Sequence, residues 1–259
     1  MGTWKFSFPI NGLHDVIKQD SNIDIDGVIF HYRTRNERVG TVTAEGNTEQ
    51  MAEWESKYLI NRSLGKICFA FNTEASISPG GLYYIDLINN PNVETITSSL
   101  EVRYSYVKET PEIVLAKMYS IRSDKQDTLG LALAYYKLGE YKNPLRIESF
   151  FSSMTVLVRD IWKDEFTKSD NIPTKDLKEK IRLVLSKRNA STFDVITFYR
   201  QWNDCYADER CSIAHGRGSK LVDPRTILEY NKIVNTVHYW ARELIYYYID
   251  TFQNQSYPG

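Results

Sequence analysis

Apolar and polar positions divide the chain into two parts with different spacing. Residues 2–108 mix alternating, strand-like segments with one helical segment, whereas the sequence after Pro111 has helical spacing almost to its end. The expected fold class is an α+β, β-rich N-terminal domain at 1–108 followed by an all-α helical bundle at 109–255. Neither part contains an internal repeat or a low-complexity tract.

The first part begins with a strand pattern, because apolar residues alternate with polar ones over residues 4–8. The pair Asp26-Gly27 is a turn signal between two further apolar segments. Asn47 or Thr48 is expected to cap a helix that runs towards residue 71. Later strands are expected at 82–88 and 100–107.

The second part is punctuated by prolines that stand at or near the first position of a helix, as in Asn143-Pro144 and Asp223-Pro224. The polar stretch 163–171 is expected to be an internal loop. Helices are expected at 112–121, 125–139, 144–164, 174–188, 192–214 and 224–252.

Composition is that of an ordinary soluble protein, with 42% hydrophobic and 25% charged residues. A formal net charge of −1 excludes a protein that coats nucleic acid, although a local basic patch is enough for a transient encounter. Three cysteines give neither a disulfide framework nor paired zinc-ligand spacing. With no signal peptide and no apolar stretch long enough to span a bilayer, the expected location is the cytoplasm, away from membranes.

A candidate catalytic pair lies in the segment ERCSIAHG (209–216), where Arg210 and His215 stand five positions apart. In a regular α-helix this spacing gives about 500° of rotation, so the two side chains would point roughly 140° apart. They converge only where the helix ends or deforms. Gly216 and Gly218 accept the left-handed conformation of a helix cap and are expected to end this helix just after His215.

An arginine and a histidine that face one phosphodiester suit RNA cleavage. A histidine titrates near neutrality and exchanges protons, while a guanidinium holds phosphate and stabilises the charge of the transition state. With no metal or cofactor implied, the nucleophile is the 2′-hydroxyl of the RNA. The expected products are a cyclic phosphate and a free 5′-hydroxyl.

The motif Arg210-x4-His215 resembles the Arg-x(4–6)-His signature of HEPN domains, small helical bundles that usually act as dimers. The run LGLALAYYKLGEYKNPLRIESFFSSM (129–154) resembles the first helical hairpin of the ApeA/MauJ-like branch, in which an α+β or β-rich domain precedes the HEPN domain. The resemblance covers about 109–252. It implies a metal-independent endoribonuclease, a homodimer with a composite site, and a toxin or phage-defence effector regulated by a protein partner of the N-terminal domain.

The same resemblance suggests supporting residues. Glu148 matches the position from which an earlier helix supports the pair, and Cys211 and Ser212 follow the motif arginine. Cys211 departs from the Asn, Asp or His common in the family, and a thiol is a weak hydrogen-bonding substitute. Families silenced by a nucleotidyltransferase carry tyrosine two positions after the histidine, where this chain has arginine. The residues expected to contact phosphate are Arg217, Lys220 and Arg225.

Two other functions fit the same residues. The helical domain could bind RNA or a nucleotide without cutting it, with the α+β domain contacting a partner, or the protein could be a structural dimerisation module. For Arg210 the plain alternative is an ion pair or a helix carbonyl cap, and for His215 a residue stabilised by the helix dipole. His238, on the last helix, is expected to serve packing or an interface.

Overall fold

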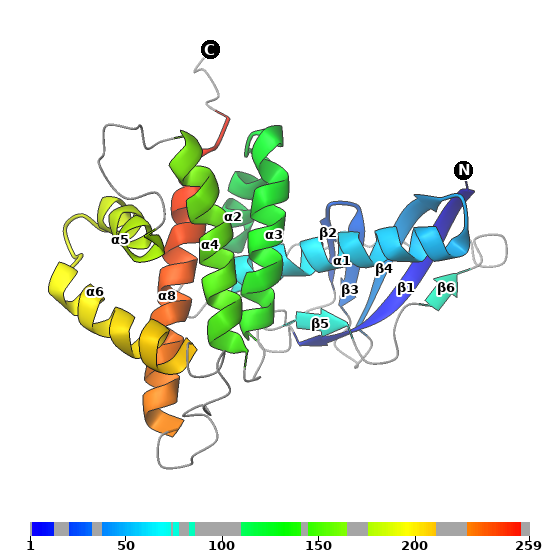
Figure 1. The fold of residues 1–259 in the computed structure, drawn as a ribbon. Helices are drawn as coiled ribbons and strands as arrows, with labels where there is room; N and C mark the ends of the chain where they lie inside the picture. Colours follow the sequence, from blue (N-terminus) through cyan, green and yellow to red (C-terminus); the bar gives the residue numbers. More distant parts are fainter. Residues whose placement is uncertain are drawn as a thin grey trace. The chain divides into compact units, whose positions relative to one another are not determined.

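The computed structural model divides the chain into two compact units, Met1–Val114 and Leu115–Gly259, called here the N-terminal unit and the helical unit. The first combines a sheet with a long helix and the second is helical (Figure 1). The expected order, an α+β part followed by a helical part, is therefore confirmed. The boundary expected at 108/109 lies outside the described residues. The structure describes residues 2–12, 21–32, 38–73, 75–77, 83–85, 110–140, 145–164, 176–210 and 227–254.

An antiparallel sheet forms the N-terminal unit. Its order is β2-β3-β4-β1-β5, and β6 also pairs with β1. The long first strand is therefore an interior strand, paired on one side with β4 along most of its length and on the other with β5 at its end and with β6. The strands are β1 (Gly2–Gly12), β2 (Ser21–Ile25), β3 (Val28–Tyr32), β4 (Arg38–Gly46), β5 (Ala75–Ile77) and β6 (Tyr83–Ile85).

The predicted turn at Asp26-Gly27 joins β2 to β3. Both residues have positive φ, 56° and 77°, as a two-residue hairpin turn of the primed type requires. Gly40 of β4 lies opposite Phe8 of β1, and a Cβ at position 40 would overlap the Phe8 ring. The sheet core therefore depends on a glycine beneath a phenylalanine.

Helix α1 (Glu49–Phe71) packs on this sheet. Of the two expected caps, Thr48 is the N-cap, and its hydroxyl accepts a hydrogen bond from the Met51 backbone N–H at 3.2 Å. The helix continues through Gly65 to Phe71 and ends at Asn72, which has a left-handed conformation (φ 50°). From Ser63 to Phe71 all its residues are buried, which fixes this half against the sheet.

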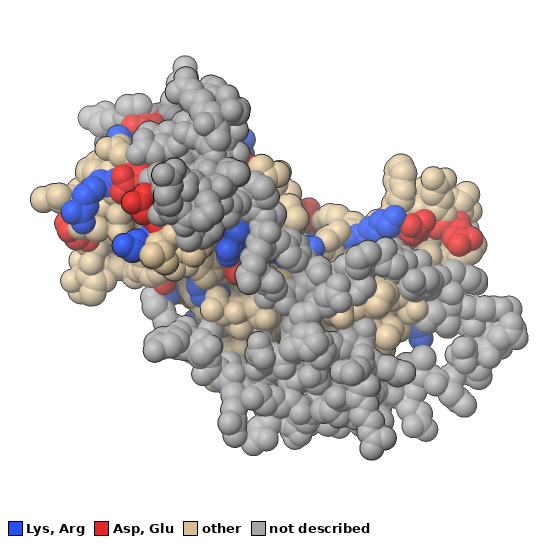
Figure 2. Space-filling view, turned by 90° about the horizontal axis from the view of Figure 1, so that it is seen from below, with Lys and Arg blue, Asp and Glu red and all other residues tan. Residues whose placement is uncertain are grey.

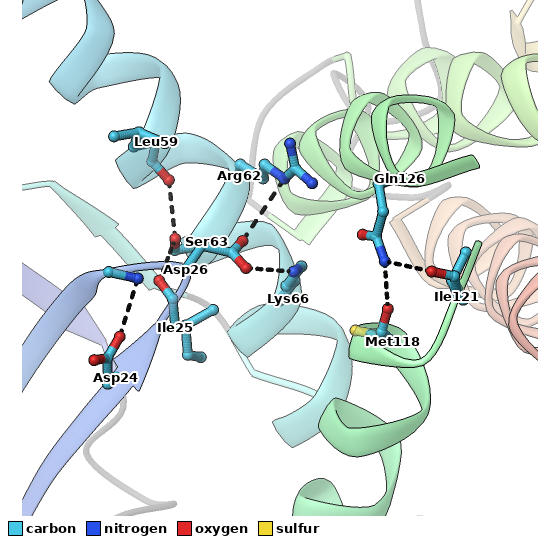
Figure 3. A network of polar contacts seen from close by, with 11 residues as sticks. Asp24, Ile25, Asp26, Leu59, Arg62, Ser63, Lys66, Met118, Ile121 and Gln126 are labelled. Carbon is cyan, nitrogen blue, oxygen red and sulfur yellow. Dashed lines mark hydrogen bonds and ion pairs between the residues drawn. The ribbon is translucent and has the colours of Figure 1, made fainter. Parts of the chain in front are cut away.

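A small polar network anchors the β2–β3 turn to α1 (Figure 3). The Ser63 hydroxyl donates to the Ile25 carbonyl at 2.8 Å, and the Lys66 ammonium lies 2.8 Å from an Asp26 carboxylate oxygen. The Lys66 side chain is only 2% exposed. Burial lowers the pKa of Lys66, while the Asp26 hydrogen bond and charge oppose that shift.

In the helical unit, α3 and α4 form a hairpin against α8, and apolar residues from all three fill the core. Most of the expected helices are present, with boundaries that differ from the expected ones by at most three residues. The exception is the helix expected at 192–214, where α6 gives way to a π-helical segment, η2. The helices are α2 (Pro111–Tyr119), α3 (Ser123–Glu140), α4 (Arg146–Asp164), α5 (Leu177–Arg188), α6 (Val195–Trp202), η2 (Asn203–Arg210) and α8 (Ile227–Thr251).

Buried ionic contacts join the three core helices. The Lys125 ammonium of α3 lies 3.0 Å from Asp160 and 2.6 Å from Asp164, both on α4. The Tyr248 hydroxyl of α8 donates to Asp160 at 2.7 Å. The lysine side chain is 6% exposed, so its charge depends on these carboxylates for compensation.

Backbone hydrogen bonds tie the end of α8 to the junction between α2 and α3. Arg122 N–H donates to the Phe252 carbonyl at 3.0 Å, and Asn254 N–H donates to the Ser120 carbonyl at 2.8 Å. The Gln126 side-chain amide of α3 donates to the Met118 and Ile121 carbonyls and holds the same junction (Figure 3). The two ends of the helical unit are thereby joined.

Candidate functional site

Arg210 is the last residue of η2, and its backbone is described but its side chain is not. The other residues expected around it lie outside the described residues, so their mutual geometry stays a prediction. They are Cys211, Ser212, His215, Arg217, Lys220 and Arg225. Glu148, the supporting residue expected from an earlier helix, is described and lies in the first turn of α4.

The helix that leads to Arg210 changes geometry before it arrives there. It is α-helical from Val195 to Trp202 and π-helical from Asn203 to Arg210. In a π-helix each N–H bonds to the carbonyl five residues earlier, so each turn holds more residues than in an α-helix. Within Asn203–Arg210 a separation of five residues is then closer to one full turn, whereas the interval from Arg210 to His215 lies outside the described residues.

Aromatic packing holds η2 in place. The Tyr206 ring stacks on Trp202, with centroids 4.9 Å apart and an interplanar angle of 17°, and meets the Phe151 ring of α4 edge-on at 5.3 Å. Cys205 is buried, and its sulfur lies 4.0 Å from the Ile233 carbonyl of α8. Cys205 therefore fills space between η2 and α8, as expected of a small apolar residue.

Glu148 lies on the part of α4 that contacts this segment. It precedes Phe151 by three residues, so the two share a helix face, and Phe151 carries the contact with Tyr206. Glu148 is half-buried. This position is compatible with the supporting role expected for it, which stays a prediction because the Arg210 side chain is outside the described residues.

A cavity of about 310 Å³ lies between η2 and the start of α8. Its described lining consists of Asp204, Glu229, Lys232 and Ile233. Two carboxylates and one ammonium make this lining net negative. The described lining therefore does not itself attract a phosphate.

A second polar cluster, made by Tyr136, Glu140, His238 and Arg242, has no counterpart among the sequence predictions. His238 Nε2 lies 2.5 Å from the Tyr136 hydroxyl and 2.8 Å from Glu140 Oε1, and the Arg242 guanidinium donates to the same hydroxyl at 3.4 Å. The Glu140 contact is close but not aligned as a hydrogen bond, so it stabilises only a protonated imidazole.

This cluster is partly buried and includes aromatic contacts. The Phe150 ring packs on His238 at 5.3 Å and on Tyr136 at 5.5 Å. Burial, followed by the negative charge of Glu140, raises the pKa of Tyr136 well above its usual value, so the phenol stays protonated. His238 therefore has a packing role, as expected, and also a polar one; no sequence spacing links it to Tyr136, which lies 102 positions earlier.

The described residues on the face shown in Figure 2 give no strong charge signal. In Figure 2, Lys and Arg side chains are mixed with Asp and Glu over the coloured part of the surface. Within the described ranges, no three His, Cys, Asp or Glu side chains gather closely enough to ligate a metal ion. None of the helices there combines the length and apolar character that crossing a bilayer needs.

Comparison with protein-family models, with curated proteins and with solved structures finds no match for this chain.

Proposed function

We propose that this protein is a metal-independent endoribonuclease of the HEPN type, with Arg210 and His215 as its catalytic pair. The observation that carries the proposal is the change from α- to π-helical geometry over Asn203–Arg210. Convergence of two side chains five positions apart requires a helix that ends or deforms, and the segment entering the motif is already deformed. Helical segments of this kind are rare and frequently occur at functional sites.

The chemistry assigned to the pair needs no bound metal. The 2′-oxygen of one nucleotide attacks the adjacent phosphorus while its proton passes to a base, and the 5′-oxygen of the next nucleotide leaves as it gains a proton. His215 supplies one of these proton transfers, and Arg210 stabilises the additional negative charge on the phosphoryl oxygens. The products are a 2′,3′-cyclic phosphate and a 5′-hydroxyl.

Two features of the described residues support this arrangement. The half-buried Glu148 lies on the face of α4 that contacts η2, where it can orient a guanidinium. The helical unit also has the α3–α4 hairpin over the residues that resemble the first hairpin of the ApeA/MauJ-like branch. Arg217, Lys220 and Arg225 are proposed to contact phosphates, and the N-terminal unit is proposed to contact a regulatory protein.

The test compares RNA cleavage by the wild type with Arg210→Ala, His215→Ala and the control Arg200→Ala, an exposed arginine of α6. Cleavage in EDTA, with cyclic-phosphate ends, should be lost in the first two variants and kept in the third. The wild-type rate should also change between about pH 5.5 and 8, because an imidazole titrates there. Equal residual degradation in all four proteins would indicate a contaminant and leave RNA binding as the function; 3′-hydroxyl ends would contradict the metal-free mechanism.

A further inference from the structure

A separate cavity of about 370 Å³ opens in the helical unit between the end of α5, α6 and the middle of α8. These three helices lie beside one another in Figure 1. The volume falls in the range of small-molecule sites. The cavity is distinct from the smaller one between η2 and the start of α8, with which it shares no lining residue.

Aromatic rings form much of the cavity wall. Phe198 packs on Trp240 with centroids 5.1 Å apart and on Phe193 at 5.7 Å, which fixes these rings. Tyr239 lies at the rim and is 48% exposed, although its neighbour Trp240 is buried. A flat ligand could cover the exposed Tyr239 ring and stack on it.

The polar groups of the wall include three carboxamides: Asn189, Gln201 and Asn235. Their side chains make no hydrogen bond with any residue that the structure describes, and Asn189 Nδ2 is also buried. A buried donor without a partner costs about 1–3 kcal/mol, so a ligand that satisfies it is favoured. A carboxamide offers a donor and an acceptor side by side, which matches the edge of a nucleobase.

The charge of the lining selects against an anion. No Lys, Arg or His is among its described residues. The carboxylate among them, Asp194, is used by the helix that follows, since it accepts hydrogen bonds from the Ile196 and Thr197 backbone N–H groups and from the Thr197 hydroxyl. The site therefore suits an uncharged planar group rather than a phosphate.

We propose that this cavity receives one unpaired nucleobase, stacked on Tyr239 and hydrogen-bonded to the three carboxamides. Single-stranded RNA is read in this way, by aromatic stacking and by contacts to base edges. Where the base belongs to an RNA substrate, the inference rests on the proposed nuclease function. Gln201 precedes Arg210 by nine residues, an axial rise of less than about 14 Å because most of this stretch is π-helical, so a few nucleotides of a single strand can span it. The cavity would then set a base preference a few nucleotides from the cut.

The test uses the full chain carrying His215→Ala, so that RNA is not cleaved, and fluorescent RNA octamers of A, C or U together with an abasic octamer. Tyr239→Ala should weaken binding of at least one base-bearing octamer about tenfold, since stacking contributes about 1–3 kcal/mol per base. Asn235→Ala should weaken the same octamer, and neither variant should alter abasic binding. Tyr58→Ala, on α1 with a similarly exposed ring, is the control and should change neither.

A second measurement identifies the source of the base. If single nucleosides occupy the cavity, saturation-transfer NMR with the four free nucleosides should give signals on their base protons, and Tyr239→Ala should abolish these signals. If only the octamers bind and the nucleosides give no signal, the base belongs to an RNA strand. The proposal would be overturned if the Tyr239→Ala variant bound every octamer as tightly as the wild type does. It would also be overturned if the variant kept its RNA affinity and lost only self-association, measured by sedimentation. If the wild type binds bases but does not cleave RNA, the nuclease proposal fails and the base site stands. If it cleaves RNA but Tyr239→Ala has no effect on base binding, the base site fails and the nuclease proposal stands.

Discussion

At the scale of single residues, the Asp26–Lys66 pair shows how a buried ammonium group depends on a nearby carboxylate. Asp26→Asn keeps a residue type that accepts the positive φ of the turn but leaves the Lys66 ammonium buried without its carboxylate. Breaking a buried pair costs about 3 kcal/mol. The free energy of opening of the α1 amides, measured by hydrogen exchange, should therefore be lower by this amount in Asp26→Asn than in the wild type.

The control for this prediction is Asp24→Asn. Asp24 is exposed, and its carboxylate accepts a hydrogen bond from Gly27 N–H at 3.0 Å, which an asparagine oxygen also accepts. Protection of α1 should therefore change by less than about 0.5 kcal/mol. Equal protection in both variants would mean that Lys66 does not need Asp26.

Single residues also show what the sequence could predict about chemistry. The Asp26-Gly27 turn and the Thr48 cap follow from local preferences, and both are present. The cluster around His238 could not be predicted, because Tyr136 and Glu140 come from α3 and a polar contact across two helices has no spacing in the sequence. Burial of a polar side chain is set by the tertiary fold.

At the scale of elements, α3 and α4 meet at a glycine. A Cβ at Gly139 would lie 2.6–2.8 Å from atoms of the Phe150 ring, which itself packs on Tyr136 and His238. Gly139→Ala gains about 1 kcal/mol of helix propensity but overpacks the contact by about 1–3 kcal/mol. The expected net result is a destabilised helical unit, measured by hydrogen exchange of α3 and α4.

The double variant Gly139→Ala/Phe150→Leu provides the matched comparison. A leucine is smaller than the ring and gives room to the new methyl group, so the glycine substitution should cost less in the Phe150→Leu background than in the wild type. A cost that is the same in both backgrounds would mean that the Phe150 contact does not limit position 139.

The π-helical segment can be tested by shortening it. Deleting Ala207 leaves Trp202, Cys205 and Tyr206 in their packed positions and lets the backbone return to α-helical bonding, which moves Arg210 by one position, or about 100°. We expect RNA cleavage to fall at least 100-fold while circular dichroism shows an unchanged helix content. Full activity in the deletion variant would show that the wider turn is not needed for the site.

Two element predictions differ from the structure for physical reasons. β4 has no counterpart among the predicted strands, because three positions of its buried face hold the small residues Gly40, Ala44 and Gly46, and Val42 alone does not make an alternating apolar pattern. Those positions are small because the Phe8 ring and α1 lie over them. The segment 192–214 reads as one α-helix in the sequence, because a change in backbone hydrogen bonding over eight residues leaves no clear side-chain period.

At the scale of the whole molecule, the proposed site would be completed by a second copy. Mixing Arg210→Ala with His215→Ala should restore part of the cleavage lost in each, because a mixed dimer can combine an intact arginine with an intact histidine. Activity is measured after the two variants are refolded together, and each variant alone, treated in the same way, is the control. Sedimentation that shows monomers only, in an active wild type, would contradict the composite site.

The hydrogen bonds between the end of α8 and the α2–α3 junction have a topological consequence. Because Asn254 bonds to Ser120 and Arg122 bonds to Phe252, the chain enters and leaves the helical unit at nearly the same point. A unit with adjoining ends can be inserted into a host protein, or circularly permuted, with little strain. A pulling force on the carboxyl end would therefore act first on this junction, and the opposite end of the bundle, where Arg210 lies, would not bear it directly.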